Sequence, residues 1–290
     1  MTDFFMDSKR AELEERRNTM AKYCKKFNET DKNLDDILSN IIIDKKHNIS
    51  WCPIYKAASS TWMKNFAVLG GILSKPIIKL LKENKVALNV LVKQTFSHVL
   101  VNNATVTLSE LEDTRKILIV RHPLERLLSA YRDKLENMIN REYYYKRFGR
   151  YIAYKYHESR KENETSLEPT FKEFLQYIVD EKYFDEHWAP YYSTCIPCTI
   201  NYDFILKLET LDEDEKFLIQ ETGLVYELDL HEVSKVKNSN PNGITNEEVV
   251  VKYLKNIPAS LLQKLDKIYD KDFKLFNYES SQQYLMKNQT

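Results

Sequence analysis

One short apolar run restricts the possible folds of this chain more than any other feature. Residues 116–120 (Lys-Ile-Leu-Ile-Val) are continuously apolar after the lysine, as expected of a strand that is buried on both faces. Pro123 follows and suits the first turn of a helix, where its missing N–H is not needed. Residues 49–55 predict a second buried strand, followed by a polar turn and a helix over 61–69 that a glycine pair ends. Strands alternating with helices predict an α/β fold with a central, mostly parallel sheet flanked by helices.

Further elements follow from the same patterns. The highly charged residues 7–27 predict a helix with Ser8 as its N-cap, and residues 86–97 predict an apolar strand or a helix that runs into one. After Pro123, apolar side chains at helical spacing predict a stripe packed against the sheet: Leu124, Leu127, Leu128, Tyr131 and Leu135. Other amphipathic helices are expected over 170–179, 212–222 and 258–269.

Size and charge exclude several classes of protein. A length of 290 residues predicts a single domain over 1–290, with 1–45 as an N-terminal helical extension. With 43% apolar and 30% charged residues the chain is globular rather than disordered. Lys plus Arg and Asp plus Glu both number 43, so only local patches can attract a charged partner, and nucleic acid is a poor candidate. The sequence shows no membrane span and no signal peptide, which is expected of a cytosolic chain or of a luminal piece without its anchor.

The cysteines and glycosylation sequons bear on that choice. Four cysteines (Cys24, Cys52, Cys195 and Cys198) permit three complete pairings, and the Cys195-Ile-Pro-Cys198 pair fits a redox, structural or half-zinc role. No second close Cys/His pair has zinc-site spacing. Sequons at Asn28, Asn48, Asn103, Asn163 and Asn288 exceed the roughly two or three expected by chance, which favours a secretory compartment.

The turn after the first strand is the first candidate ligand site. Residues 56–62 read Lys-Ala-Ala-Ser-Ser-Thr-Trp, and they lead into a helix whose first N–H groups suit a phosphate or sulfate. Lys56 adds a positive charge, and three hydroxyl groups follow it. The glycines of a triphosphatase loop are absent. The alternative is a serine-rich helix cap beside a solvated lysine.

The second candidate follows the 116–120 strand. Arg121 ends that strand at the carboxyl edge, where open α/β sheets bind ligands, and its guanidinium can hold a phosphate with two hydrogen bonds. Ser129 lies about two helical turns further, off the apolar stripe, and its hydroxyl can reach the same group. The alternative is that Arg121 pairs with a carboxylate such as that of Glu125.

Taken together, these two stretches resemble the signatures by which sulfotransferases hold 3′-phosphoadenosine 5′-phosphosulfate (PAPS). Residues 52–62 and 119–134 resemble those of the Golgi carbohydrate sulfotransferases, which include chondroitin and dermatan 4-O-sulfotransferases and the natural-killer-epitope sulfotransferase. The similarity continues in order through 186–188, 195–198, 202–205, 207–211 and 269–278. Tyr55 departs from the proline of many members, and the family's membrane anchor has no counterpart in this sequence.

The resemblance implies a P-loop-like fold that moves a sulfuryl group from PAPS to a glycan hydroxyl and leaves adenosine 3′,5′-bisphosphate. It implies no metal, a Golgi location, structural cysteines, and an acceptor of chondroitin or dermatan type or a related glycan containing glucuronate or GalNAc. Arg121 and Ser129 are expected at the 3′-phosphate. The 5′-phosphosulfate is expected to contact Lys56, Ala57, Ala58, Ser59, Ser60, Thr61 and Trp62, with Lys56 also stabilising the leaving group.

A general base must accept the proton of the acceptor hydroxyl, and histidine suits this role near neutral pH. His98 lies 23 residues before Arg121, at the place that the base takes in sulfotransferases generally. His187 lies in the 186–188 match and is the alternative, as base or as an acceptor contact. Either histidine can instead be structural.

A basic and aromatic stretch is expected on the acceptor side. Residues 141–161 hold seven Lys or Arg, two Glu and six Tyr, a composition that suits a polyanionic glycan, and 136–168 is expected to be an acceptor-side helical insertion. An ordinary solvated helix is the alternative. Two other functions stay open, namely a P-loop-like kinase that needs magnesium and a non-catalytic glycan-binding relative.

Overall fold

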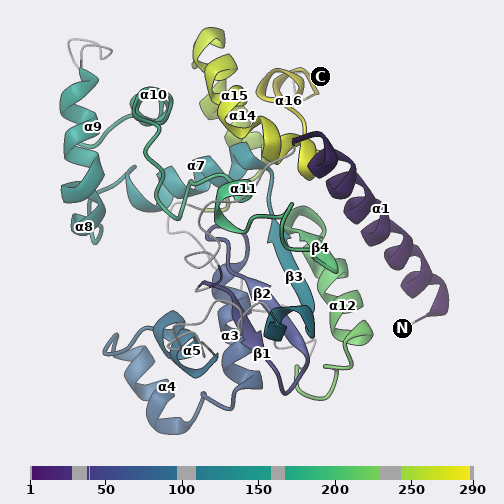
Figure 1. The fold of residues 1–290 in the computed structure, drawn as a ribbon. Helices are drawn as coiled ribbons and strands as arrows, with labels where there is room; N and C mark the ends of the chain where they lie inside the picture. The colour runs from purple at the N-terminus through teal and green to yellow at the C-terminus, as the bar shows by residue number, and fades with distance from the viewer. Residues whose placement is uncertain are drawn as a thin grey trace. The chain divides into compact units, whose positions relative to one another are not determined.

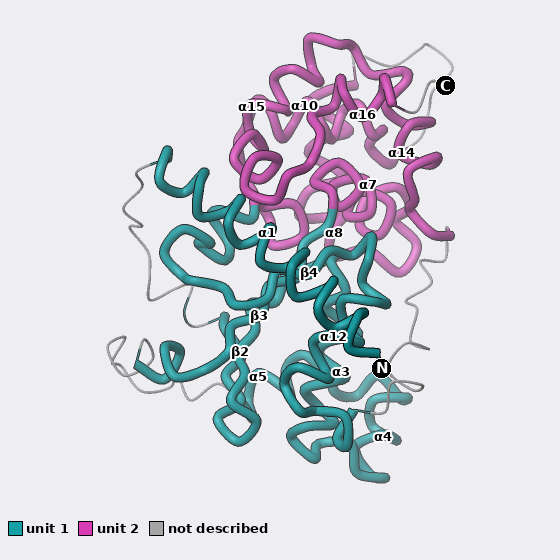
Figure 2. The backbone as a smooth tube through the Cα atoms, turned by 90° about the vertical axis from the view of Figure 1, so that its right-hand side faces the viewer, with its two compact units in different colours: residues 1–121, 191–238 teal, residues 122–190, 239–290 magenta. Residues whose placement is uncertain are grey.

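The computed structural model describes residues 2–27, 38, 40–96, 109–157, 167–228 and 243–287. The chain forms two compact units, each made of two separate stretches of sequence (Figure 2). Unit 1 consists of residues 1–121 and 191–238, and unit 2 of residues 122–190 and 239–290. The single domain expected over 1–290 stays a prediction, as do the extension over 1–45 and the insertion over 136–168.

Unit 1 contains a four-stranded sheet with the order β1-β2-β3-β4 (Figure 1). Its strands are Ile42–Asp44, Ile49–Cys52, Arg115–Val120 and Phe204–Lys207. Strand β1 is antiparallel to β2, whereas β2, β3 and β4 are parallel. The predicted α/β class with a mostly parallel sheet is therefore confirmed, and the run over 116–120 is the buried central strand β3.

The helices of unit 1 surround this sheet. They are α1 (Asp3–Phe27), α3 (Ser59–Leu69), α4 (Lys75–Lys82), α5 (Leu88–Phe96), α11 (Tyr191–Thr194), the 3-10 turn η3 (Leu208–Thr210) and α12 (Leu211–Glu221). Their core is aromatic beside the sheet: the rings of Trp51 on β2 and Phe66 on α3 stack with centroids 5.6 Å apart.

One expectation about these helices was wrong, and another is met by one of its two alternatives. Helix α1 begins at Asp3, so Ser8 lies inside it and is not its N-cap. Over Leu88–Phe96 the 86–97 stretch is helix α5 and not a strand, as the alternative of a helix that runs into a strand expected for its first part; residue 97 lies outside the described residues. Val92 and Phe96 are its buried residues, and their spacing of four places them on one helical face.

Helix α1 is held against unit 1 by a buried carboxylate. Asp214 on α12 has no exposed surface, and its oxygens lie 3.2 Å from Lys9 Nζ and 2.6 Å from Arg16 Nη1. Arg16 also donates to the carbonyl of Ile205 on β4. Removing these two cations would leave the charge of Asp214 buried without an opposite charge, so this network fixes α1 to β4 and α12.

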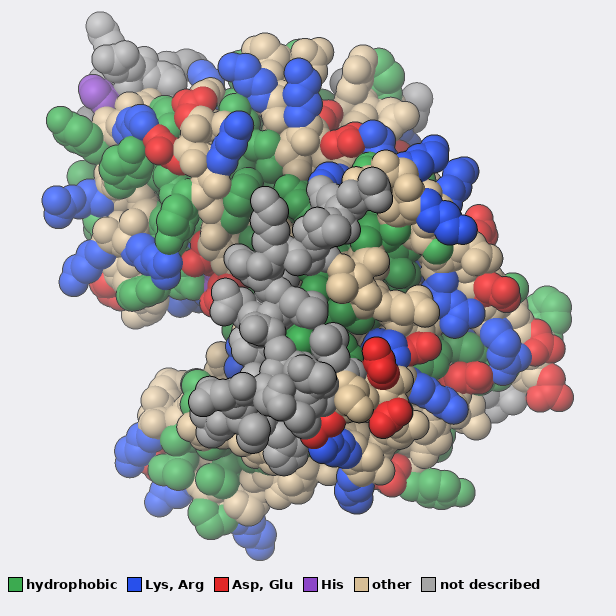
Figure 3. Space-filling view, in the orientation of Figure 1, with side chains coloured by type: hydrophobic (Ala, Val, Ile, Leu, Met, Phe, Trp, Pro, Cys, Tyr) green, Lys and Arg blue, Asp and Glu red, His purple; other side chains and the backbone are tan. Residues whose placement is uncertain are grey.

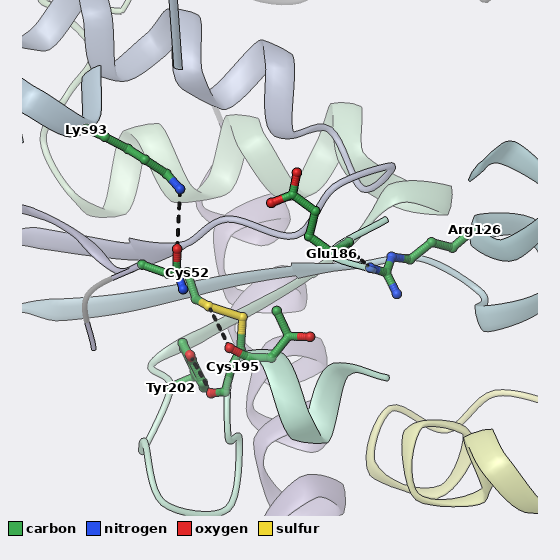
Figure 4. Close-up of a disulfide and its surroundings, with 8 residues drawn as sticks. Cys52, Lys93, Arg126, Glu186, Cys195 and Tyr202 are labelled. Atoms are coloured by element: carbon green, nitrogen blue, oxygen red, sulfur yellow. Dashed lines mark hydrogen bonds between the residues drawn. A yellow bond between two sulfur atoms is a disulfide. The ribbon is translucent and has the colours of Figure 1, made fainter. Parts of the chain in front are cut away.

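Both disulfides of the chain lie in unit 1. Cys24 near the end of α1 joins Cys198. Cys52 at the end of β2 joins Cys195, and Figure 4 shows this second disulfide. Cys195 and Cys198 therefore do not pair with each other, and neither is available as a metal ligand or reactive thiol. The cysteine pair has a structural role, as the family resemblance implied.

The described part of unit 2 consists of helices. Its elements are α7 (Pro123–Lys134), α8 (Glu142–Tyr144), the π-helical η1 (Tyr145–Gly149), α9 (Arg150–Lys155), α10 (Phe171–Glu181), α14 (Glu247–Leu254), α15 (Ala259–Leu275) and α16 (Ser281–Lys287). The predicted stripe of α7 is buried, but it packs into a core formed by α10, α14 and α15 and not against the sheet. Among the described residues, no helix is long and apolar enough to span a membrane.

Candidate functional site

Three connections leave the same edge of the unit 1 sheet. Strands β2, β3 and β4 are parallel, so their carboxyl ends lie together. The loop over 53–58 follows β2, Arg121 follows β3, and η3 follows β4. Two of these connections carry the phosphate motifs expected from the sequence.

The loop after β2 has an unusual backbone. Lys56 and Ala58 have positive φ angles of 68° and 58°, and Ala57 between them is fully buried. A left-handed residue other than glycine costs about 1 to 2 kcal/mol, so the surrounding structure must impose it. Left-handed residues that alternate with other backbone conformations can turn N–H groups toward one side as an anion-binding concavity, so we call residues 56–58 the nest. The Ala57 N–H itself donates to the carbonyl of Ile54 at 3.3 Å.

This nest leads directly into helix α3. Ala58 is the N-cap residue and has no side-chain group to bind the first N–H groups of the helix. Ser59 is buried, Thr61 is half-buried and Ser60 is exposed. The backbone and hydroxyl donors of this turn, together with the positive end of the helix dipole, therefore suit an anion.

Trp62, which was expected to contact the nucleotide, is a core residue. Its side chain is fully buried, and its Nε1 donates to Glu215 Oε1 at 2.7 Å. Its backbone N–H donates to the carbonyl of Ala58 at 3.1 Å. Both N–H groups are engaged within the protein, so we reassign Trp62 to holding the start of α3 in place.

Arg121 meets the loop at Lys56. The residue is only 7% exposed, and its Nη1 donates to the carbonyl oxygen of Lys56 at 3.4 Å. Within unit 1 the structure thus brings Arg121 of the second motif to the Lys56 loop, although the two residues are 65 positions apart in the sequence. The guanidinium adds a permanent positive charge beside the nest.

Ser129 and the neighbouring residue His122 belong to unit 2. Ser129 lies on α7 and is 7% exposed. His122 is the N-cap of α7: its Nδ1 accepts from the N–H of Leu124 at 3.3 Å, and its Nε2 lies 3.1 Å from the carbonyl of Glu279. These contacts place the proton on Nε2, so His122 is a neutral helix cap.

The two candidate bases differ in what the structure describes. His98 lies outside the described residues. His187 belongs to unit 2 and is buried, with its Nδ1 at 2.6 Å from Asp185 Oδ1 and 3.3 Å from the hydroxyl oxygen of Tyr144. Burial lowers the pKa of His187 and outweighs the opposing effect of Asp185. The arrangement orients a neutral imidazole whose basic lone pair is on Nε2.

Sequence reasoning missed two residues that act on the loop and on Arg121. Glu215 bonds Trp62, and the hydroxyl of Tyr191 bonds the backbone of Arg121. Both contacts join residues that are far apart in the sequence, and no periodicity or spacing marks either residue in advance. The only signal was that Tyr191 lies close to the Cys195 pair.

Comparison with known proteins places the chain in a family. It belongs to the sulfotransferase family, whose profile matches residues 39–279. It is 33% identical to carbohydrate sulfotransferase 9 of Homo sapiens over 275 residues, which cover 91% of this chain and 59% of the relative. Carbohydrate sulfotransferase 11 of Mus musculus is 30% identical over 250 residues (83% of this chain, 67% of the relative). Carbohydrate sulfotransferase 14 of Danio rerio is 30% identical over 249 residues (83% and 63%). No solved structure matches the chain.

The chain thus spans between 59% and 67% of the length of these three relatives. The family membership expected from the two phosphate motifs is confirmed, and the matched region includes parts of both units.

The surroundings of Glu215 shift the pKa of its carboxyl group, and this shift can be tested by experiment. Burial raises its pKa to about 7, the hydrogen bond from Trp62 opposes this, and Asp212 and Asp214 add repulsion. In the unfolded chain the carboxyl group has its ordinary pKa of about 4.3. Folding therefore takes up a proton at intermediate pH, and ionisation of the folded state costs stability.

We expect the folded state to lose stability as the pH rises from below 4.5 through 7, relative to a Glu215→Gln variant that cannot ionise. The stability advantage of the variant should grow by about 2.5 kcal/mol between pH 5 and pH 8, because the two pKa values differ by this much and part of the difference is already felt at pH 5. Urea unfolding of both proteins at the two pH values measures the difference, with exposed Glu227→Gln as the control. An advantage that does not change with pH would contradict the assignment.

Proposed function

We propose that this chain is a PAPS-dependent carbohydrate O-sulfotransferase. It transfers a sulfuryl group from PAPS to a hydroxyl group of a glycan and releases adenosine 3′,5′-bisphosphate. The observation that carries the proposal is the contact between the Arg121 guanidinium and the Lys56 loop, because it gathers a cation, a lysine and a helix N-terminus at one edge of the sheet. Membership of the sulfotransferase family supports the same reaction.

The residues of the loop fit the 5′-phosphosulfate. The nest and the first turn of α3 supply N–H and hydroxyl donors, including those of Ser59, Ser60 and Thr61. Lys56 stabilises the negative charge that grows on the bridging oxygen as the sulfur–oxygen bond breaks. The reaction needs positioning and charge stabilisation, which these groups provide, so the proposal gives no role to a metal.

Arg121 is assigned to the 3′-phosphate, together with Ser129 as expected from the second motif. A guanidinium can bind a phosphate with two parallel hydrogen bonds. ATP has no 3′-phosphate and therefore cannot form this contact with Arg121. Arg121 therefore gives the site its selectivity for a 3′-phosphorylated nucleotide.

For the general base, we propose His98, with His187 as the alternative. The place of His98 before the β3 strand supports the first assignment. The buried pair of His187 with Asp185 supports the second, since a carboxylate that accepts from Nδ1–H favours the tautomer with its basic lone pair on Nε2.

We further propose that the protein acts in the Golgi lumen. Two disulfides that join distant parts of unit 1 are typical of an oxidising compartment. Asn48, the described sequon residue, is exposed at the turn between β1 and β2 and is therefore accessible to a glycosyl group.

The acceptor is proposed to be a polyanionic glycan of chondroitin or dermatan type, or a related glycan containing glucuronate or GalNAc. We propose that this glycan binds to a surface of unit 2 where basic and aromatic side chains are exposed together, and we name it the Arg147 surface. The residues of this surface are Tyr143, Arg147, Tyr151, Lys155 and Tyr183. Figure 3 shows Lys and Arg side chains among hydrophobic ones over α8 and α9.

Contacts within this surface orient its central cation. Arg147 Nη1 donates to the hydroxyl of Tyr143 at 2.8 Å, and Nη2 donates to that of Tyr183 at 3.3 Å. Its guanidinium also lies 4.8 Å from the ring centroid of Phe148. Arg147 Nη1 also lies 3.8 Å from Asp185 Oδ2, and Lys155 is paired with Glu181. The proposal assigns Arg147 to a glycan carboxylate because a planar guanidinium can bind a carboxylate with two hydrogen bonds.

The nucleotide site is tested by thermal melting with added ligand. Adenosine 3′,5′-bisphosphate should raise the melting temperature, and Arg121→Ala should weaken its binding by about tenfold to a hundredfold through loss of charge-assisted hydrogen bonds. Lys56→Ala should lower sulfate transfer from PAPS to desulfated glycosaminoglycans by roughly a hundredfold or more. Lys79→Ala on exposed α4 is the control.

Two results would replace this proposal by a rival. Stabilisation by ATP with magnesium, but not by adenosine 3′,5′-bisphosphate, would indicate a kinase. Glycan binding that survives Lys56→Ala and Arg121→Ala, with no transfer to any acceptor, would indicate a non-catalytic relative.

The base is identified by comparing His98→Ala with His187→Ala in the transfer assay. The variant that removes the base should lower kcat by about a hundredfold or more and leave the affinity for adenosine 3′,5′-bisphosphate unchanged. We expect this of His98→Ala. If His187→Ala shows it instead, the base is His187, and full activity of both variants would exclude a histidine base.

The acceptor surface is tested with Arg147→Ala. We expect the KM for the glycan to rise about threefold to tenfold, with an unchanged KM for PAPS, because one partly exposed ion pair with the acceptor is lost. Lys267→Ala, an exposed cation on α15 of the same unit, is the matched control. An equal effect of both variants would mean that only overall charge matters, and no effect of either would remove the surface from the proposal.

A further inference from the structure

We infer that Tyr191 is the positioning residue for Arg121, and that it sets the selectivity of the proposed site for a 3′-phosphorylated nucleotide. The inference rests on the function proposed above. Tyr191 is 1% exposed, and its hydroxyl contacts both backbone groups of one residue. It donates to the carbonyl of Arg121 at 2.7 Å and accepts from the N–H of Arg121 at 3.2 Å.

This double contact acts where the sheet stops. The pairing of β3 with β4 ends at Val120 opposite Lys207, so Arg121 is the first residue past the ladder. Buried backbone groups in such a place need partners from elsewhere in the fold. One hydroxyl can donate and accept at once, and here it holds the peptide groups on both sides of the Arg121 Cα atom. The direction of the Arg121 side chain is thereby fixed.

Tyr191 is itself held by a covalent constraint. It begins α11, and four residues later Cys195 is joined to Cys52 at the end of β2. The carbonyl of Cys195 also accepts from the hydroxyl of buried Tyr202 at 2.9 Å, as Figure 4 shows. The hydroxyl of Tyr191 therefore belongs to a segment whose place beside β2 is set by a bond and not only by packing.

The bonds that hold Arg121 and the Lys56 loop form a closed circuit of covalent and hydrogen bonds, which we call the ring. From Cys52 the chain runs through the loop to Lys56, whose carbonyl accepts from the Arg121 guanidinium. The Arg121 backbone is bonded to Tyr191, and the Cys195 disulfide leads back to Cys52. The ring fixes the Arg121 guanidinium relative to the loop, and so sets the spacing between the proposed 5′-phosphosulfate and 3′-phosphate contacts. Small displacements of such groups have large effects on binding and rate.

The test is a Tyr191→Phe variant, which removes the hydroxyl and keeps the ring. Calorimetry measures the affinity for adenosine 3′,5′-bisphosphate and for adenosine 5′-monophosphate, which lacks the 3′-phosphate. We expect the preference for the bisphosphate to fall by about tenfold and the affinity for the monophosphate to stay within about twofold, since only the 3′-phosphate contact depends on Arg121. In an Arg121→Ala background the same substitution should leave the preference unchanged.

Tyr131→Phe is the matched control, because it also removes a buried tyrosine hydroxyl that donates to a backbone carbonyl, here that of Pro169, without touching Arg121 or the Tyr191 segment. It should keep the wild-type preference. If Tyr191→Phe weakens both nucleotides equally, or keeps the full preference, the inference is wrong. If the wild-type protein itself shows no preference for the bisphosphate, the proposed function fails and not the role of Tyr191.

A second measurement uses the unaltered protein, in case the variant does not fold. The Arg121 amide should exchange its hydrogen slowly, because it donates to a buried hydroxyl. Exchange at the rate of an open peptide, with adenosine 3′,5′-bisphosphate bound, would overturn the inference.

Discussion

The covalent attachment of one short segment is the constraint on which the candidate site depends. Cys195 is joined to the end of β2 and Cys198 to the end of α1, so the segment between them is held at two points of unit 1. The bonds close long loops, with separations of 143 and 174 residues, and loops of this length give a disulfide its largest effect on the unfolded chain. Because Cys52 also precedes the Lys56 loop, the Cys52–Cys195 disulfide both stabilises the sheet and fixes the position at which this loop begins.

The Lys56 loop adopts left-handed backbone conformations at residues other than glycine. The chain has only five glycines, and the left-handed positions of the loop are occupied by Lys56 and Ala58. Their backbone cost must be offset by the surroundings, and the structure shows how. The side chain of Trp62 is buried one turn into α3 and bonded to Glu215 on α12, which anchors the helix just after the strained residues. The absence of a glycine-rich loop, which argued against a triphosphatase, is therefore compatible with a nest built from other residues.

The sequence predicted those parts of the fold that depend on local pattern. Three features could be predicted because a few residues close together in the sequence define each of them. They are the apolar run of β3, the turn before α3 and the stripe of α7. The partner of the stripe was wrong, because an apolar face does not say whether a sheet or another helix covers it. The cysteine pairing and the contact between Tyr191 and Arg121 join residues that are 70 or more positions apart, and the tertiary fold alone sets them. Strand β1 has only three residues, too few for a periodic signal.

The second motif has a dual structural role that its sequence did not reveal. Arg121 closes the sheet of unit 1, whereas His122 opens α7 of unit 2, so the boundary falls between two consecutive residues. Each is held within its own unit: Arg121 by the hydroxyl of Tyr191, and His122 by the N–H of Leu124 and the carbonyl of Glu279. The rings of Tyr278 and Tyr284 also pack on His122, with centroids 5.1 and 4.4 Å away. The histidine beside the proposed phosphate-binding arginine is thus explained by helix capping and packing, and the chemistry proposed for this motif rests on the arginine.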